Sequence, residues 1–296
     1  MKRGVDRLNQ YQDDHTKLGI LDWLSSMDYT SQHRDSVSRR QGGTGRWLLD
    51  SAEFMAWVSG GSSTLLCWGL PGAGKTILTS LMIDELATKY RKDPDVAIAH
   101  IYLEHRQQDG QKVEHIFESL LRQLVSGQPA VPDSVRSLYE DHIRHGSRPA
   151  FNEISQNIRL VAALYTKIFI VIDALDEYPA GGRRERLLGE VFKLQADCSA
   201  NIFCTSRPNP EITERFGQQA LEVRARDQDV RTYLDSQMVH LPAFVVRSQG
   251  LQEHIKDEIV KAADGMCVFP LTLPSKSRAH IIARADSCLR IFISIL

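Results

Sequence analysis

Hydrophobic residues fall into short, dense runs that alternate with segments of helical spacing. Five runs predict strands, at residues 64–68, 96–103, 168–172, 201–205 and 220–223. The run at 168–172 is continuous, which indicates a strand covered on both faces, as in a parallel sheet. Apolar residues spaced three or four apart predict amphipathic helices between the runs. The alternation predicts an α/β fold: a doubly wound, mainly parallel sheet with flanking helices and right-handed crossovers.

The pattern is weaker toward the two ends of the chain. An apolar cluster at 18–24 predicts a short helix, and the polar stretch Ser31–Arg40 predicts a flexible segment. Helical spacing runs from Trp47 to Val58, and three helices are expected between 112 and 166. Further helices are expected at 187–194, 226–240 and 251–263. These elements give a short helical N-terminal segment, an α/β core, a helical extension and an irregular C-terminal tail.

A glycine-rich turn separates the first strand from the helix after it. Its residues are Gly69, Leu70, Pro71, Gly72, Ala73, Gly74, Lys75 and Thr76, which fit the P-loop pattern G-x-x-x-x-G-K-[ST]. Such a turn points backbone N–H groups and the positive end of a helix dipole at an anion. In this pattern Lys75 reaches the β- and γ-phosphates and the Thr76 hydroxyl binds Mg²⁺. An ordinary glycine turn would leave Lys75 and Thr76 unexplained, so the turn predicts a nucleotide site.

Acidic and basic residues follow the third and fourth predicted strands of the core. Asp173 ends the most apolar strand, where a carboxylate that holds Mg²⁺ belongs. Asp176 and Glu177 follow, and either one could orient or activate a water for attack on the γ-phosphate. Arg207 comes two residues after the strand at 201–205, where a cation can touch that phosphate. The alternative interpretation of the acids is a solvated turn.

Composition narrows the class of protein and of partner. The net charge of −1 gives no broad footprint for nucleic acid or an anionic membrane, so neither is expected as a partner. The cluster Arg183–Arg186 is expected to be a solvated helix start. No secretory signal is recognised, and five cysteines without a C-x-x-C pair suit a reducing cytoplasm. We therefore expect a cytoplasmic protein.

The motifs together resemble a NACHT domain of the nephrocystin-like N-terminal type, common in large signalling proteins of filamentous fungi. The resemblance rests on four segments and covers about residues 18–269: Thr44–Leu49, Gly69–Thr76, Ile168–Glu177 and Thr205–Pro208. On this basis the four parts of the chain are a helical and linker segment, a NACHT P-loop NTPase domain, a helical extension and an atypical tail, at residues 1–45, 46–240, 241–269 and 270–296.

The resemblance implies a STAND-class NTPase, a switch that rests with ADP bound and self-associates when activated. It implies phosphate and Mg²⁺ roles for Lys75 and Thr76 and a Mg²⁺ role for Asp173. It implies that Asp176 and Glu177 act in hydrolysis and that Arg207 senses the phosphate. The segment Thr44–Trp47 is expected to contact the base or close the pocket.

The chain departs from this family pattern in two ways. Relatives normally carry an N-terminal effector and C-terminal ankyrin, WD or tetratricopeptide repeats, and neither is recognised here. After Met266 a winged-helix region is expected. The sequence from Pro270 onward looks foreign to the family instead, as in a truncated gene or a misread intron. If the winged-helix contacts that stabilise the ADP-bound state are missing, the sequence does not establish that the chain works as a switch.

Three functions therefore remain as hypotheses. The first is a signalling or incompatibility-type switch that binds ATP or ADP with Mg²⁺ and hydrolyses ATP slowly. The second is a P-loop small-molecule kinase, for which Arg183–Arg186 is the lid candidate. The third is a truncated, non-catalytic interaction module. The guanine-reading tetrapeptide [NT]-K-x-D is not found, which favours ATP and leaves GTP possible.

Overall fold

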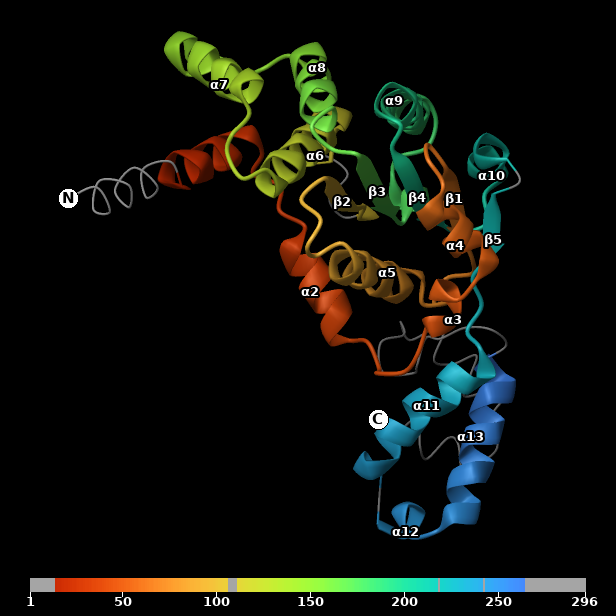
Figure 1. Cartoon of the computed structure of the whole chain (residues 1–296). Helices are drawn as coiled ribbons and strands as arrows, with labels where there is room; N and C mark the ends of the chain where they lie inside the picture. Colours follow the sequence, from red (N-terminus) through yellow and green to blue (C-terminus); the bar gives the residue numbers. More distant parts are fainter. Residues whose placement is uncertain (1–13, 106–110, 218, 242, 264–296) are drawn as a thin grey trace, which may run out of the picture.

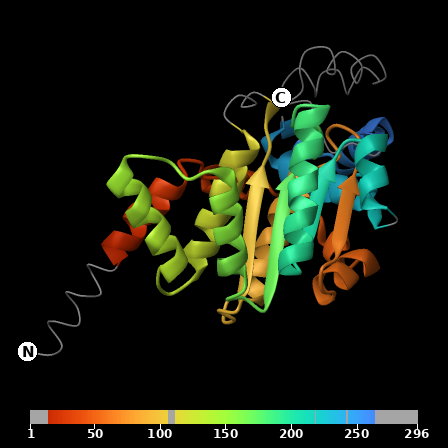
Figure 2. The same cartoon turned by 90° about the horizontal axis from the view of Figure 1, so that it is seen from above.

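The fold is built on a five-stranded parallel sheet. A computed structural model describes residues 14–105, 111–217, 219–241 and 243–263. The strands have the order β2-β3-β4-β1-β5 and point the same way (Figure 2). Their bounds are β1 Thr64–Trp68, β2 Val96–Tyr102, β3 Lys167–Asp173, β4 Asn201–Ser206 and β5 Ala220–Glu222. The predicted doubly wound sheet and all five predicted strands are confirmed.

Helices cover both faces of this sheet (Figure 1). The helices on one side are α6 Val113–Gly127, α8 Phe151–Ala162 and α9 Gly182–Cys198, with α7 Asp133–His145 beyond them. On the other side lie α5 Lys75–Lys89 and, packed on it, α2 Thr30–Ser38. The short helices beside β1 are α3 Arg46–Leu49, α4 Ala52–Ser59 and α10 Pro210–Phe216. The two layers bury β3 and β4 almost completely, as the continuous apolar runs predicted.

Aromatic packing joins the helices to the centre of the sheet. The Trp57 ring of α4 lies 5.1 Å from the ring of Phe169 and 5.7 Å from that of Phe203. Its indole N–H donates to the carbonyl of Ile202 at 3.0 Å, which satisfies the one polar atom of a buried side chain. Trp57 thereby packs α4 against the amino-terminal halves of β3 and β4, away from the carboxyl ends of these strands.

The expectation of a flexible segment at Ser31–Arg40 is wrong. Residues 30–38 form α2, and residue Ser36 is buried. The ring of His33 hydrogen-bonds the Tyr102 hydroxyl at 2.9 Å and a carboxylate oxygen of Asp84 at 3.2 Å. Tertiary contacts with β2 and α5 stabilise a helix whose sequence has no strong apolar face, because helix formation depends largely on packing.

The predicted helix between Trp47 and Val58 is two helices. The chain breaks at Asp50 and Ser51, where the Ser51 side chain accepts from the N–H of Phe54 and caps α4. The apolar spacing therefore runs through two separate helices, of which α4 packs on β1.

The C-terminal helices form a second, smaller core. This unit consists of α11 Asp227–Gln237, the 3₁₀ turn Met238–His240, α12 Ala243–Val246 and α13 Gln249–Ala263. Its buried residues include Leu234 and Ile255, and the cluster begins at Ala225. It therefore starts before the predicted boundary between residues 240 and 241, and the fourfold division of the chain stays a prediction. The tail from residue 270 lies outside the described residues. No helix in the described ranges has the length and apolar content that a bilayer span needs.

Burial of His100 on β2 predicts a pH-dependent stability. Burial and the neighbouring His33 lower the pKa of His100 from 6.5 to about 4. Because the unfolded chain takes up this proton first, stability falls as the pH drops from 6.5 to about 4. We expect a loss of about 3 kcal/mol over this window. Urea unfolding at a series of pH values measures it.

The His100→Gln variant should lose this part of the pH dependence. The exposed His145, changed to Gln in the same way, is the control and should retain it. An unchanged pH profile in His100→Gln would contradict the assignment.

Candidate active site at the carboxyl ends of the strands

The loop Gly69–Thr76 joins β1 to α5 and has the backbone of an anion-binding turn. Gly72 has φ +80° and Gly74 has φ +87°, conformations that side chains disfavour. A Cβ at Gly69 would lie 2.3 Å from the carbonyl oxygen of Val223, so the loop also needs a glycine there to pass β5. The turn ends at Lys75, the first residue of α5, which directs the helix N-terminus into the loop.

The Lys75 side chain folds back over this loop. Its ammonium donates to the carbonyl oxygens of Gly69 at 2.7 Å and Leu70 at 3.0 Å. Desolvation lowers the pKa of Lys75, while the charges of Asp176 and Asp173 oppose the shift. A cation thus lies in the turn that the N–H groups line, which adds positive charge where a phosphate would bind.

The Asp173 carboxylate hydrogen-bonds residues of two neighbouring elements at the carboxyl edge of the sheet. Asp173 is 2% exposed. Its Oδ2 accepts from the Thr76 hydroxyl at 2.7 Å, and its Oδ1 accepts from Thr79 at 2.9 Å and Thr205 at 2.6 Å. Burial raises the pKa of Asp173, and the three hydroxyl donors oppose this shift. The P-loop helix, β3 and β4 are therefore tied at one carboxylate.

The residues after β3 turn sharply toward the same edge. Ala174 has φ +57° and begins the 3₁₀ turn η2, Leu175–Glu177. The backbone N–H of Arg207 donates to Oδ1 of Asp176 at 2.9 Å, and Nε of Arg207 lies 3.0 Å from Oδ2. Glu177 accepts from the N–H of His105 at 3.1 Å, and its other oxygen lies 3.7 Å from Arg207. Both predicted acids and the predicted cation therefore lie together.

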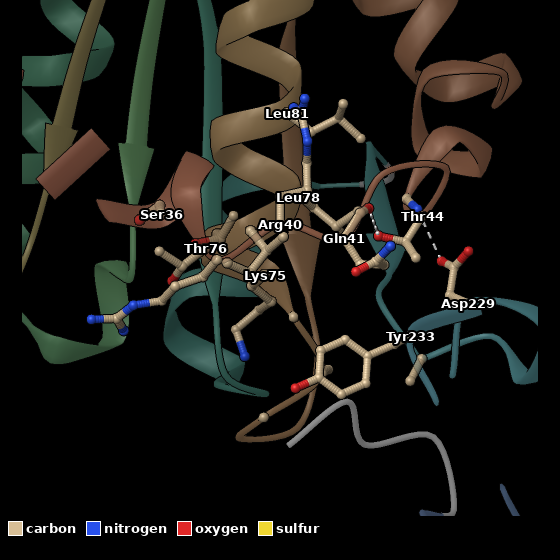
Figure 3. Close-up of a pocket in the computed structure, with 18 of the residues that line it drawn as sticks. Ser36, Arg40, Gln41, Thr44, Lys75, Thr76, Leu78, Leu81, Asp229 and Tyr233 are labelled. Carbon is tan, nitrogen blue, oxygen red and sulfur yellow. Dashed lines mark hydrogen bonds between the residues drawn. The ribbon is translucent and has the colours of Figure 1, made fainter. Parts of the chain in front are cut away.

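A cavity of about 770 Å³ runs from the P-loop to α11 (Figure 3). Lys75 and Tyr233 extend into it from α5 and α11. Asp176, Glu177 and Arg207 line it near the loop, and the segment Gln41–Trp47 lines it near α11. Its size suits a nucleotide-sized ligand, because small-molecule pockets typically measure about 300–1,000 Å³.

Two contacts hold α11 against the segment Gln41–Trp47. The Gly45 N–H donates to Oδ2 of Asp229 at 3.0 Å, and the Arg226 guanidinium lies 4.5 Å from the centre of the Trp47 ring. Gly45 has φ +79°, and a Cβ there would meet Leu78 at 2.7 Å. The cavity is thus closed on one side by residues almost two hundred positions apart.

Several residues of the site carry no sequence signal. Thr79 and Thr205 are ordinary threonines in the sequence, and Asp229 lies in a helix with no recognised motif. The expectation that Arg183–Arg186 is wholly solvated is wrong for Arg184, which is 6% exposed. Its position could have identified Thr205, because it lies near the carboxyl end of β4, two residues before the predicted Arg207.

The chain is similar to one family model and to several solved structures. The model described as nephrocystin 3, N-terminal, matches residues 43–207. The ORC2 protein of Aeropyrum pernix shares 14% identity with a TM-score of 0.45, and the alignment covers 88% of this chain and 62% of that one. Cdc6p of Pyrobaculum aerophilum shares 13% identity with a TM-score of 0.48, and the alignment covers 78% of this chain and 59% of that one. This chain thus spans about three fifths of each. No curated protein matches it significantly.

Proposed function

Because the chain belongs to the nephrocystin 3 N-terminal family of P-loop NTPase domains, we propose that it binds and slowly hydrolyses ATP as a STAND-type switch. The observation that carries the proposal is the bond of 2.7 Å between Thr76 and Asp173. It brings the P-loop and the acidic strand end to one point, beside a nucleotide-sized cavity.

In this proposal the P-loop binds the phosphates and Mg²⁺. The N–H groups of the loop and the helix dipole hold the phosphate oxygens, and Lys75 adds its charge. Oxygen atoms, such as the Thr76 hydroxyl oxygen and carboxylate oxygens, are the hard ligands that Mg²⁺ prefers. Since Asp173 is buried behind Thr76, Thr76 would hold the ion and Asp173 would fix the threonine. Mg²⁺ would neutralise phosphate charge during hydrolysis.

Glu177 is the better candidate for the base that takes a proton from water. Both oxygens of Asp176 are engaged by Arg207, and its side chain is 13% exposed, against 32% for Glu177. A base needs access to the water that it activates. We therefore assign proton transfer to Glu177, orientation of Arg207 to Asp176, and contact with the γ-phosphate to Arg207.

We extend the proposal to the identity of the nucleotide and to the partners of the chain. ATP is proposed as the nucleotide, ADP as the resting ligand, and GTP as the competitor to be tested. Self-association through this domain, and control by effector and repeat domains of longer relatives, would convert nucleotide state into a signal. Within the lid candidate Arg183–Arg186 of the kinase hypothesis, Arg184 is buried and bonded to backbone carbonyls, which disfavours a mobile lid there.

Phosphate release from ATP and GTP tests this function. We expect slow, Mg²⁺-dependent release from ATP, with none in EDTA. Phosphate transfer to an added small-molecule acceptor, at the expense of release, would favour a kinase. If the chain binds no nucleotide, the hypothesis of a non-catalytic interaction module would be favoured.

Asp229 should support nucleotide affinity although it lies outside the P-loop. Asp229→Ala removes the acceptor for the Gly45 N–H and frees one wall of the cavity. A hydrogen bond to a charged group contributes about 1.5–3 kcal/mol, so we expect ATP affinity to fall by roughly tenfold or more. Stopped-flow dissociation of a fluorescent ATP analogue measures the change.

Asp235→Ala is the matched control on the same helix. The Asp235 side chain is 61% exposed and bonds Lys256 of α13, away from the cavity. Equal losses in both variants would show that α11 matters only for folding.

A further inference from the structure

Arg184 is a buried cation in a costly position. It is 6% exposed and lies in the first turn of α9, where the helix dipole disfavours positive charge. Its nearest carboxylate is Glu211, 3.9 Å away and 74% exposed, so the ion pair is weak. Its Nε has no hydrogen-bond partner among the described residues. Burying a charged guanidinium costs free energy, and one weak ion pair offsets little of that cost. Stability of the fold therefore does not explain why an arginine lies here.

The bonds that Arg184 does make go to the turn that carries the two acids. One terminal nitrogen, Nη2, donates to the carbonyl oxygens of Asp176 at 2.9 Å and Tyr178 at 2.6 Å. These two carbonyls lie on either side of Glu177. The Arg184 guanidinium therefore holds the backbone of the turn, while Arg207 holds the Asp176 side chain.

Other contacts of this turn leave the carbonyls of Asp176 and Tyr178 to Arg184: the N–H of Ala174 donates to the Thr205 hydroxyl at 2.8 Å, and the N–H of Tyr178 donates to the carbonyl of Leu175 at 3.3 Å. The turn begins at Ala174 with φ +57°, and within it the N–H of Glu177 donates to the carbonyl of Ala174 at 2.8 Å. Directly after Glu177 the chain leaves η2 in an extended conformation at Tyr178. Without Arg184, both carbonyls would point into a buried space without a donor, and the turn would relax.

We propose that Arg184 is a positioning residue for NTP hydrolysis, which fixes Glu177 by holding the carbonyls on both sides of it. The inference rests on the proposed function. It goes beyond it by assigning a role to a residue that is not among those lining the cavity. Arg184 acts on the turnover step and leaves the P-loop as it is.

The Arg184→Met variant separates positioning from stability. Methionine keeps the length and apolar stem but donates no hydrogen bond. Misplacing a catalytic group by about 1 Å can cost about 10²-fold in rate, so we expect kcat to fall by about that factor. KM for ATP should stay within a few-fold, and Tm within a few degrees. Arg183→Met, which removes an exposed charge one residue away, is the control and should retain turnover.

A double-mutant cycle identifies the group through which Arg184 acts. If it acts through Glu177, Arg184→Met should add little to the loss already caused by Glu177→Gln. Multiplicative losses in the double variant would overturn the inference. If Arg184→Met fails to fold, Arg184→Lys serves in its place, because one ammonium retains donors for the carbonyls; we expect it to fold and to recover part of kcat. Wild-type kcat in Arg184→Lys would overturn the inference, because the position of Glu177 would then not depend on the guanidinium.

The outcomes also separate this inference from the proposed function. A wild-type chain without turnover would overturn both. Turnover in wild type with an unchanged kcat in Arg184→Met would overturn this inference alone. A joint loss of Tm, nucleotide affinity and kcat would show that Arg184 is merely structural.

Discussion

The Lys75→Ala variant is expected to lose ATP binding. It removes the cation that the structure places in the P-loop, bonded to the carbonyls of Gly69 and Leu70. Hydrogen bonds to charged groups contribute about 1.5–3 kcal/mol each, so the affinity should fall by about 10²-fold or more. Isothermal titration calorimetry of wild type and variant with ATP and Mg²⁺ measures the loss.

The fold should survive this substitution. The side chain of Lys75 is part-buried at the cavity, and the glycine conformations of the loop do not depend on it. Lys89→Ala, at the exposed far end of the same helix, is the control. ATP affinity within a few-fold of wild type in Lys75→Ala, with the control unchanged, would refute the P-loop assignment.

Glu177→Gln is expected to stop turnover while ATP stays bound. Glutamine matches the shape of glutamate, and its carbonyl oxygen can still accept from the N–H of His105. It cannot take a proton from water, and a general base contributes about 10²–10⁴-fold to a rate. Single-turnover hydrolysis of radiolabelled ATP measures the chemical step, and calorimetry measures the binding.

Glu53→Gln, on α4 and remote from the cavity, controls for loss of charge. Turnover at the wild-type rate in Glu177→Gln would mean that the acid is not the base. Loss of turnover together with loss of binding would point to a structural role for the turn.

The parts of the site that short sequence patterns encode are the parts that the sequence predicted. The P-loop is a contiguous motif, and Asp173 follows from the rule that ligand-binding residues end parallel strands. Each of these depends on a local period or a fixed spacing. The structure places both at the same edge of the sheet, with a hydrogen bond between Thr76 and Asp173.

The residues that were missed act over long separations in the chain. Asp229 meets Gly45 across 184 positions, and Thr205 meets Asp173 across 32. No spacing rule links such pairs in one sequence. Residues 30–38 and Arg184 were misjudged for a related reason: polar side chains predict solvent, yet tertiary contacts bury part of them. Hydropathy alone does not report which polar group will find a buried partner.

The most direct test of the nucleotide site is a structure of the chain determined with Mg²⁺ and a non-hydrolysable ATP analogue. We expect the triphosphate to lie in the loop Gly69–Thr76 beside Lys75, and the base to lie between the segment Gln41–Trp47 and α11. A triphosphate bound elsewhere, or a loop that excludes the analogue at saturating concentration, would contradict the account.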